Sequence, residues 1–125
     1  MTTTAWAHLP NAKHIDAVLA DVQKRPEAWT TAWTAARDAA WEAAWGVVWH
    51  AARAPAWTVA RDAARYTARD VITALIAWDS AADLLECTPD VLRAMIDLAE
   101  PPVCHQAALL LPYAIARSKA KQEVT

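Results

Sequence analysis

The stretch AWTTAWTAARDAAWEAAWGVVWHAARAPAWTVARDAARYTARD, residues 28–70, decides the fold of this chain. It repeats every four residues, with a small residue, most often Ala, followed by Trp or Arg. Alanine is the strongest helix former, and the stretch contains only one glycine, Gly46. The repeat therefore predicts helix, with a break or a sharp kink near Pro55, where a helical hydrogen bond is lost.

The four-residue period of this repeat does not match the α-helix. Each step moves the large residue about 40° around the helix axis, so the tryptophans from Trp29 to Trp49 sweep about 200°. A helix that is large and apolar over more than half of its circumference is central in its fold or contacts a partner. The repeat alone leaves both options open.

The arginines of the repeat allow two interpretations. Pairs such as Trp33 and Arg37 are i, i+4 neighbours, and each can form a cation–π contact of about 0.5–1 kcal/mol. In one interpretation the Trp rings lie in the core and the Arg stems cover them. In the other, the rings and guanidinium groups form a surface for a partner or ligand. The candidate residues for such a surface are Trp49, Arg53, Trp57, Arg61, Arg65, Tyr66 and Arg69.

Arg61, Arg65 and Arg69 form a column of like charge at i, i+4 spacing. Such a column destabilises a helix slightly, so a compensating group is expected. In one interpretation, acidic side chains of the same chain pair with these arginines, or the column lies on a solvated face. In the other, the compensating group is a phosphate, a nucleotide or an acidic partner.

Local signals place the other helices. Asn11 is a candidate N-cap for a helix over residues 12–24, and Pro26 suits the first turn of a helix that runs to about residue 53. The helical pattern continues over 55–86. Thr88 begins another helix, and a last one covers about 103–119, kinked or divided at Pro112.

These signals predict an all-α fold. We expect a compact bundle of about five helices with two long central Ala/Trp-rich helices, broken or kinked near Pro55. The 125 residues suit a single helical domain, with residues 1–10 and 120–125 expected to be flexible.

Charge and hydropathy bound the partners and the location. The formal net charge is −2, from 12 basic and 14 acidic side chains, so the chain lacks the basic surface that general nucleic-acid binding needs. It has no signal-peptide pattern and no charge-free run of about 18 apolar residues, so we expect no membrane partner and a cytoplasmic location. Cys87 and Cys104 are expected to be free thiols, and the alternative is a single disulfide between adjacent helices.

Residues for catalysis are sparse. The four histidines are scattered, the two serines are Ser80 and Ser118, and no His or Glu spacing typical of a metal site occurs. A single glycine excludes a glycine-rich phosphate loop. The sequence predicts no enzyme, no cofactor and no metal site.

Several blocks of the chain resemble small hypothetical proteins of bacteriophages and prophages. These blocks are PNAKHIDAVLADV (10–22), AWTTAWTAARDAAWEAAW (28–45), ALIAWDSAADLL (74–85) and ALLLPYAIA (108–116). The resemblance covers most of the chain and implies a phage or prophage accessory gene acting in the bacterial cytoplasm. It implies no activity and no site residues.

The function predicted from these observations is a non-enzymatic protein-interaction module, a phage or prophage accessory protein that modulates a host or defence protein. One alternative is a small-ligand or nucleotide binder that uses an Arg/aromatic face. Another is a self-associating structural module, so a protein partner or a homo-oligomer is expected.

Overall fold

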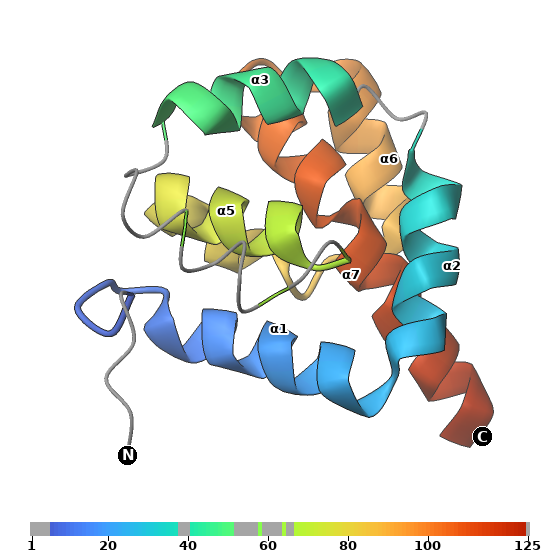
Figure 1. Ribbon diagram of the computed structural model, residues 1–125. Coiled ribbons are helices and arrows are strands. Elements are labelled where there is room, and N and C mark those ends of the chain that lie inside the picture. Colours follow the sequence, from blue (N-terminus) through green and yellow to red (C-terminus); the bar gives the residue numbers. More distant parts are fainter. Residues whose placement is uncertain (1–5, 38–40, 52–57, 59–63, 65–66, 125) are drawn as a thin grey trace.

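The computed structural model describes residues 6–37, 41–51, 58, 64 and 67–124 of the chain (Figure 1). Within these residues the chain is helical and forms no strand. The elements in chain order are α1 (Ala12–Lys24), α2 (Pro26–Ala36), α3 (Trp41–Ala51), α5 (Arg69–Ala77), the 3-10 helix η1 (Asp79–Leu84), α6 (Pro89–Leu98) and α7 (Val103–Val124). The all-α prediction is confirmed, and the described part alone contains more helices than the five or so that we expected.

The predicted long helix over residues 26–53 is instead two helices, α2 and α3, which run in different directions in Figure 1. The four-residue period therefore drifts only within each short helix, by about 80° from Ala28 to Ala36 and about 40° from Ala44 to Val48. The predicted sweep of about 200° around one helix is wrong for this reason. The predicted break or kink at Pro55 falls outside the described residues.

The centre of the fold is α7, which contacts α2, α3, α5, α6 and η1. Its residues from Gln106 to Pro112 are all buried, as are those of α5 from Asp70 to Ile76. We expected the Ala/Trp-rich helices at this position. They pack onto α7 instead, because the Leu-rich run of α7 is apolar on every side and gains more from full burial.

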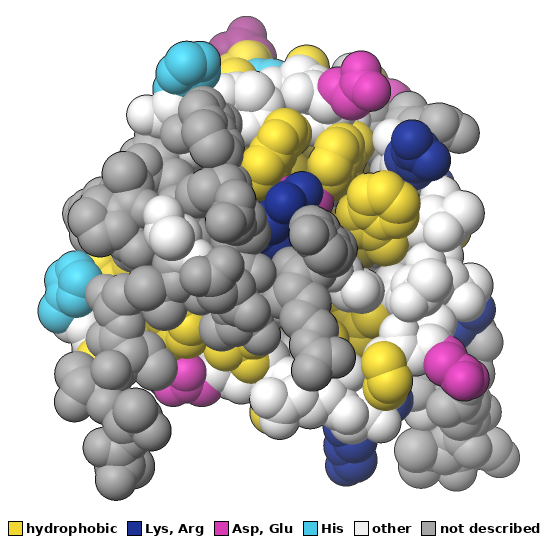
Figure 2. All heavy atoms as spheres, viewed as in Figure 1, with side chains coloured by type: hydrophobic (Ala, Val, Ile, Leu, Met, Phe, Trp, Pro, Cys, Tyr) yellow, Lys and Arg dark blue, Asp and Glu magenta, His cyan; other side chains and the backbone are white. Residues whose placement is uncertain are grey.

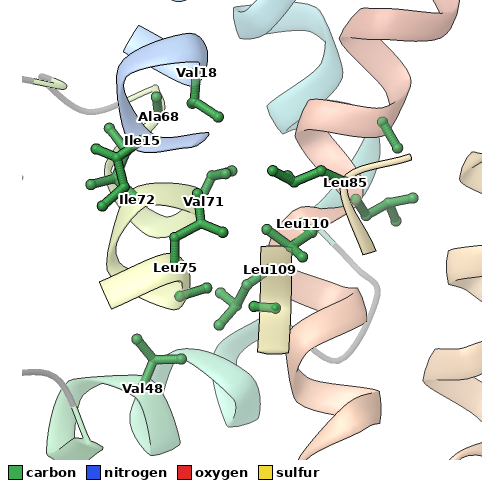
Figure 3. Packing of buried hydrophobic residues seen from close by; sticks show 14 of the residues in the cluster. Ile15, Val18, Val48, Ala68, Val71, Ile72, Leu75, Leu85, Leu109 and Leu110 are labelled. Carbon is green, nitrogen blue, oxygen red and sulfur yellow. The ribbon is translucent and has the colours of Figure 1, made fainter. Parts of the chain in front are cut away.

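Figure 3 shows the core that these helices share. Aliphatic side chains from α1, α3, α5 and α7 meet there. They include Ile15 and Val18 of α1, Val48 of α3, Val71, Ile72 and Leu75 of α5, and Leu109 and Leu110 of α7. Two tryptophans, Trp6 and Trp29, are also buried in the same core cluster.

The other predicted boundaries differ in their outcome. Thr88 caps α6 as predicted, because its hydroxyl oxygen accepts a hydrogen bond from the Val91 N–H at 3.3 Å. The helix expected over 55–86 is not continuous: in its described part α5 begins at Arg69, after a turn at 67–68, and ends at Ala77, where Trp78 takes an extended conformation before η1 begins. The last helix is not divided: Pro112 lies inside α7, which continues to Val124.

Asn11 precedes α1, but its side chain does not cap that helix. Asn11 is 2% exposed, and its Nδ2 donates to the carbonyl oxygen of Leu75 and, at 3.2 Å, to that of Trp78. Leu75 lies in the last turn of α5, where a carbonyl group lacks an intrahelical partner, and the carbonyl of Trp78 also accepts from the Ala81 N–H at 3.0 Å. Asn11 therefore ties the start of α1 to the end of α5, and the predicted capping role is wrong.

We expect Asn11→Asp to lower the free energy of unfolding by about 1–3 kcal/mol, because an aspartate offers the two carbonyl groups no N–H donor. The measurement is urea denaturation at neutral pH. Asp is as good an N-cap as Asn. An unchanged or raised stability would therefore restore the capping role and contradict the tie between α1 and α5.

None of the helices in the described part combines the length and the apolar character that crossing a membrane requires.

Candidate functional site

The candidate residues predicted from the sequence fall mostly outside the described part of the chain. Arg69 is the only one whose side chain the structure describes. Trp49 lies in α3, but its side chain is not described. Outside the described residues lie Arg53, Trp57, Arg61, Arg65 and Tyr66. The arginine column and the nucleotide site built on it therefore remain predictions.

Within the described part of the repeat, the small residues point to the core from Ala32 onward, whereas in the first pair Ala28 is half-buried and Trp29 is buried. The buried ones are Ala32 and Ala36 of α2, Ala44 and Val48 of α3, and further along the chain Ala64 and Ala68. Of the large residues that follow them, Trp33, Trp45 and Arg69 are half-buried and Arg37 is exposed, and Trp41 at the start of α3 is also half-buried. Small side chains let α2 and α3 approach α7 closely, and the bulky ones are left at the edge of the contact.

Three of these half-buried tryptophans form one cluster across α2 and α3. The rings of Trp33 and Trp41 meet edge to face, with centroids 5.8 Å apart and planes at 83°. The rings of Trp41 and Trp45 are stacked, with centroids 6.0 Å apart and planes at 9°. Such pairs contribute about 0.5–1.5 kcal/mol beyond the burial of their area. The cluster therefore holds α2 and α3 together at the surface.

Two guanidinium groups lie over this cluster. Arg37 lies over the ring of Trp33 at 5.5 Å, which confirms the predicted i, i+4 cation–π pair. Arg69 of α5 lies over the ring of Trp45 at 5.3 Å, a contact between distant segments that the repeat did not reveal. Figure 2 shows large hydrophobic side chains gathered around a basic side chain in the region between α2 and α3.

Asp70 lies beneath the cluster and is 2% exposed. Its Oδ1 lies 3.7 Å from Nε of Arg69, too far for a hydrogen bond. Among the described residues neither carboxylate oxygen accepts a hydrogen bond, and the indole N–H groups of Trp33 and Trp41 have no acceptor. The cluster thus combines a buried acid with two buried indole donors, none of which makes a hydrogen bond of good geometry, although the Trp33 N–H is near enough to the acid to lower its pKa.

Burial raises the pKa of Asp70 from 3.8 to about 6. The positive charge of Arg69 and the nearby N–H groups of Trp33 and Arg69 lower the pKa, but they compensate only part of the desolvation. Because desolvation outweighs these favourable interactions, the anionic form of Asp70 is less stable than that of an exposed aspartate. We call Trp33, Trp41, Trp45, Arg69 and Asp70 together the Trp–Asp70 cluster.

Trp29 shows how a structural tryptophan of the same repeat differs. It is 0% exposed, its Nε1 donates to Oδ2 of Asp21 at 2.7 Å, and its ring lies 5.7 Å from that of Tyr113. Asp21 also accepts from Arg25, which bonds in turn to the carbonyl oxygen of Ala116 at 3.1 Å. The indole N–H of Trp29 and the side chains of Asp21 and Arg25 thus all have partners, and the contact joins α1, α2 and α7.

A separate open hollow lies at the start of α6. It is lined by Glu86, Cys87, Thr88, Pro89, Asp90, Ala114, Arg117 and Ser118. Arg117 is engaged there, because it donates to the carbonyl oxygen of Leu85 and, at 2.9 Å, to Oε2 of Glu86. Cys87 and Cys104 are both free and half-buried. Acidic and basic side chains both line the hollow, and none of its lining residues has a buried polar atom without a hydrogen-bond partner.

In the part of the chain that the structure describes, no three side chains of His, Cys, Asp or Glu come together as a metal site would require. No protein-family model matches the sequence, and comparison with curated proteins and with solved structures found none that is similar. The candidate site therefore rests on the chemistry of the Trp–Asp70 cluster itself.

The sequence contained one signal for this cluster. Asp70 is the only charged residue from 70 to 78, at the start of the apolar run VITALIAW. A lone acid at the edge of a run that is buried on all sides is a candidate for a buried carboxylate. The contact between Arg69 and Trp45 had no such signal, because it depends on how α5 packs against α3.

Proposed function

We propose that this chain is a non-enzymatic protein-interaction module whose binding surface is the Trp–Asp70 cluster together with Arg37. In line with its resemblance to phage proteins, the proposed role is that of a phage or prophage accessory protein that modulates a host or defence protein in the bacterial cytoplasm. The observation that carries the proposal is a group of three half-buried tryptophans, two of which have an arginine guanidinium lying over the ring.

This composition is typical of protein interfaces. Trp and Arg are the residue types most enriched among those that dominate binding free energy, and aromatic residues are enriched at the interface centre. The cluster offers wide apolar rings, which lose little conformational entropy when a partner covers them. It contains no Ser, Cys or His side chain that would serve as a nucleophile or a base, so the proposal is binding rather than catalysis.

A charge reversal on the surface tests this function. Arg37 is exposed, so Arg37→Glu is expected to leave the fold intact and to weaken capture of the partner from a bacterial lysate by about tenfold or more, equivalent to about 1.4 kcal/mol. The measurement is quantitative mass spectrometry of proteins retained by the immobilised chain.

Arg93→Glu is the matched control, because Arg93 is an exposed arginine on α6. The proposal requires a protein that the wild type and Arg93→Glu retain and that Arg37→Glu loses. If no retained protein shows this dependence, the surface is not the binding surface. If the retained protein is the chain itself, light scattering of the purified protein would show concentration-dependent mass, and self-association would replace the proposed function.

A further inference from the structure

The Trp–Asp70 cluster contains a carboxylate that makes no hydrogen bond of good geometry within the described structure, although N–H groups of Trp33 and Arg69 lie near it. Asp70 is 2% exposed, so water does not replace the missing partners in the way it does for a surface acid. Leaving a buried polar group unsatisfied costs about 1–3 kcal/mol, and more for a charged one. Such groups persist where they serve a purpose, and a ligand that brings donors is one such purpose.

Arg69 shows which ligand chemistry the cluster accepts. Its guanidinium lies over the ring of Trp45 at 5.3 Å, while its Nε stays 3.7 Å from Asp70 Oδ1. The ring thus holds a planar cation next to the acid, but the acid gains charge without a hydrogen bond. A guanidinium that approached Asp70 end-on would give it two parallel N–H donors, the arrangement that makes Arg–carboxylate pairs strong.

The cluster is also accessible from the solvent side. Trp33, Trp41 and Trp45 are each half-buried, and the side chain of Arg69 is 23% exposed. Arg69 is long and has several rotatable bonds, so its guanidinium can leave the ring without a change in the backbone. An incoming cation would then stack on the indole ring and reach Asp70 along the path that Arg69 vacates.

We propose that Asp70 and the rings of Trp33, Trp41 and Trp45 form a binding site for a guanidinium group, which competes with the side chain of Arg69 for the same place. This inference rests on the proposed function and specifies it further, since the group recognised is then an arginine side chain of the partner protein. A free guanidinium compound presents the same chemistry, and the test separates the two sources.

The probes are ethylguanidinium and the blocked amino acid acetyl-arginine amide, with the neutral analogue ethylurea as the control ligand. The readout is the set of indole N–H signals in a nitrogen–proton correlation spectrum. Both cations are expected to shift the Trp33 and Trp41 signals saturably. The Trp29 signal, whose N–H is bonded to Asp21, is expected to stay in place. Tighter binding of acetyl-arginine amide indicates an arginine within a chain, and equal binding indicates that the guanidinium alone is recognised.

Two variants distinguish a site from a structural contact. Asp70→Asn is expected to abolish the shifts, whereas Asp90→Asn, a change at an exposed acid of α6, is expected to leave them unchanged. Arg69→Ala is expected to tighten ethylguanidinium binding by about tenfold, the gain for a competitor that occupies the site about nine-tenths of the time. A purely structural Asp70–Arg69 pair predicts binding to Arg69→Ala alone, in the space left by the shortened side chain, and no saturable shifts in the wild type.

The inference is overturned if neither cation produces saturable shifts, if ethylurea matches them, or if Arg69→Ala does not tighten binding. These failures differ from a failure of the proposed function. A partner whose capture depends on Arg37 while ethylguanidinium does not bind would leave the interaction surface in place and remove only the guanidinium site.

Discussion

Replacing Asp70 with Asn is expected to raise the free energy of unfolding by about 3 kcal/mol at pH 7 and to leave it nearly unchanged near pH 3.5. The cause is the buried carboxylate beneath the tryptophans, whose pKa burial raises from 3.8 to about 6. The difference of about two pH units corresponds to about 3 kcal/mol, since each unit is about 1.4 kcal/mol.

The direction in which stability changes with pH follows from which state, folded or unfolded, binds the proton of Asp70. Between pH 3.8 and about 6 the folded state keeps the proton of Asp70, and the unfolded state releases it. Stability from this group is therefore fully present below pH 3.8 and is lost as the pH rises through about 6. Asparagine has a similar shape and no charge, so the variant avoids this loss. Arg69 limits the loss but does not remove it, because its Nε stays 3.7 Å from the carboxylate.

The measurement is urea denaturation of the wild type and of Asp70→Asn at both pH values. The difference between their free energies of unfolding isolates Asp70, because the other titrating groups contribute equally to both proteins. Asp90→Asn serves as the control, because Asp90 is exposed in the first turn of α6, where a negative charge is favourable. That change is expected to cost a few tenths of a kcal/mol at pH 7. If Asp70→Asn were less stable than the wild type at pH 7, Asp70 would be a satisfied structural group and the account of the cluster would fail.

The parts of the fold that the sequence predicted are those set by neighbouring residues. Pro26 in a first turn and the Thr88 cap depend on chemistry within four residues, and both were predicted correctly. The helix over residues 12–24 was placed correctly because its apolar face has the period of a helix. The cation–π pair of Trp33 and Arg37 is likewise local.

The parts that the sequence did not predict depend on packing between distant segments. Asn11 has the residue type of a cap, but its amide satisfies carbonyl groups 64 and 67 residues away. The binding residues predicted from the repeat, of which only Arg69 has a described side chain, do not include Asp70, Trp33 and Trp41, where the described structure leaves polar groups unsatisfied. A repeat specifies which residues recur, but the break between α2 and α3 decides which of them face α7.

The inward orientation of the small residues leads to the second large prediction. Ala44→Leu is expected to lower the free energy of unfolding by about 2–3 kcal/mol, because Ala44 is 0% exposed in α3, a helix that contacts both α7 and α5. Extra methyl groups in a well-packed core force side chains off their rotamers and shift the backbone, at a typical cost of about 1–3 kcal/mol. The upper part of that range is expected, because Leu adds three carbon atoms at a buried position where α3 packs against neighbouring helices.

Ala43→Leu is the matched control, since Ala43 is the exposed neighbour on the same helix and Leu is nearly as good a helix former as Ala. Its expected effect is within about 0.5 kcal/mol. Equal effects at the two positions would mean that the small residues of the repeat serve helix propensity alone. A loss confined to Ala44 would show that they set the distance between helices, and thereby leave Trp41 and Trp45 half-buried at the surface, available to a partner.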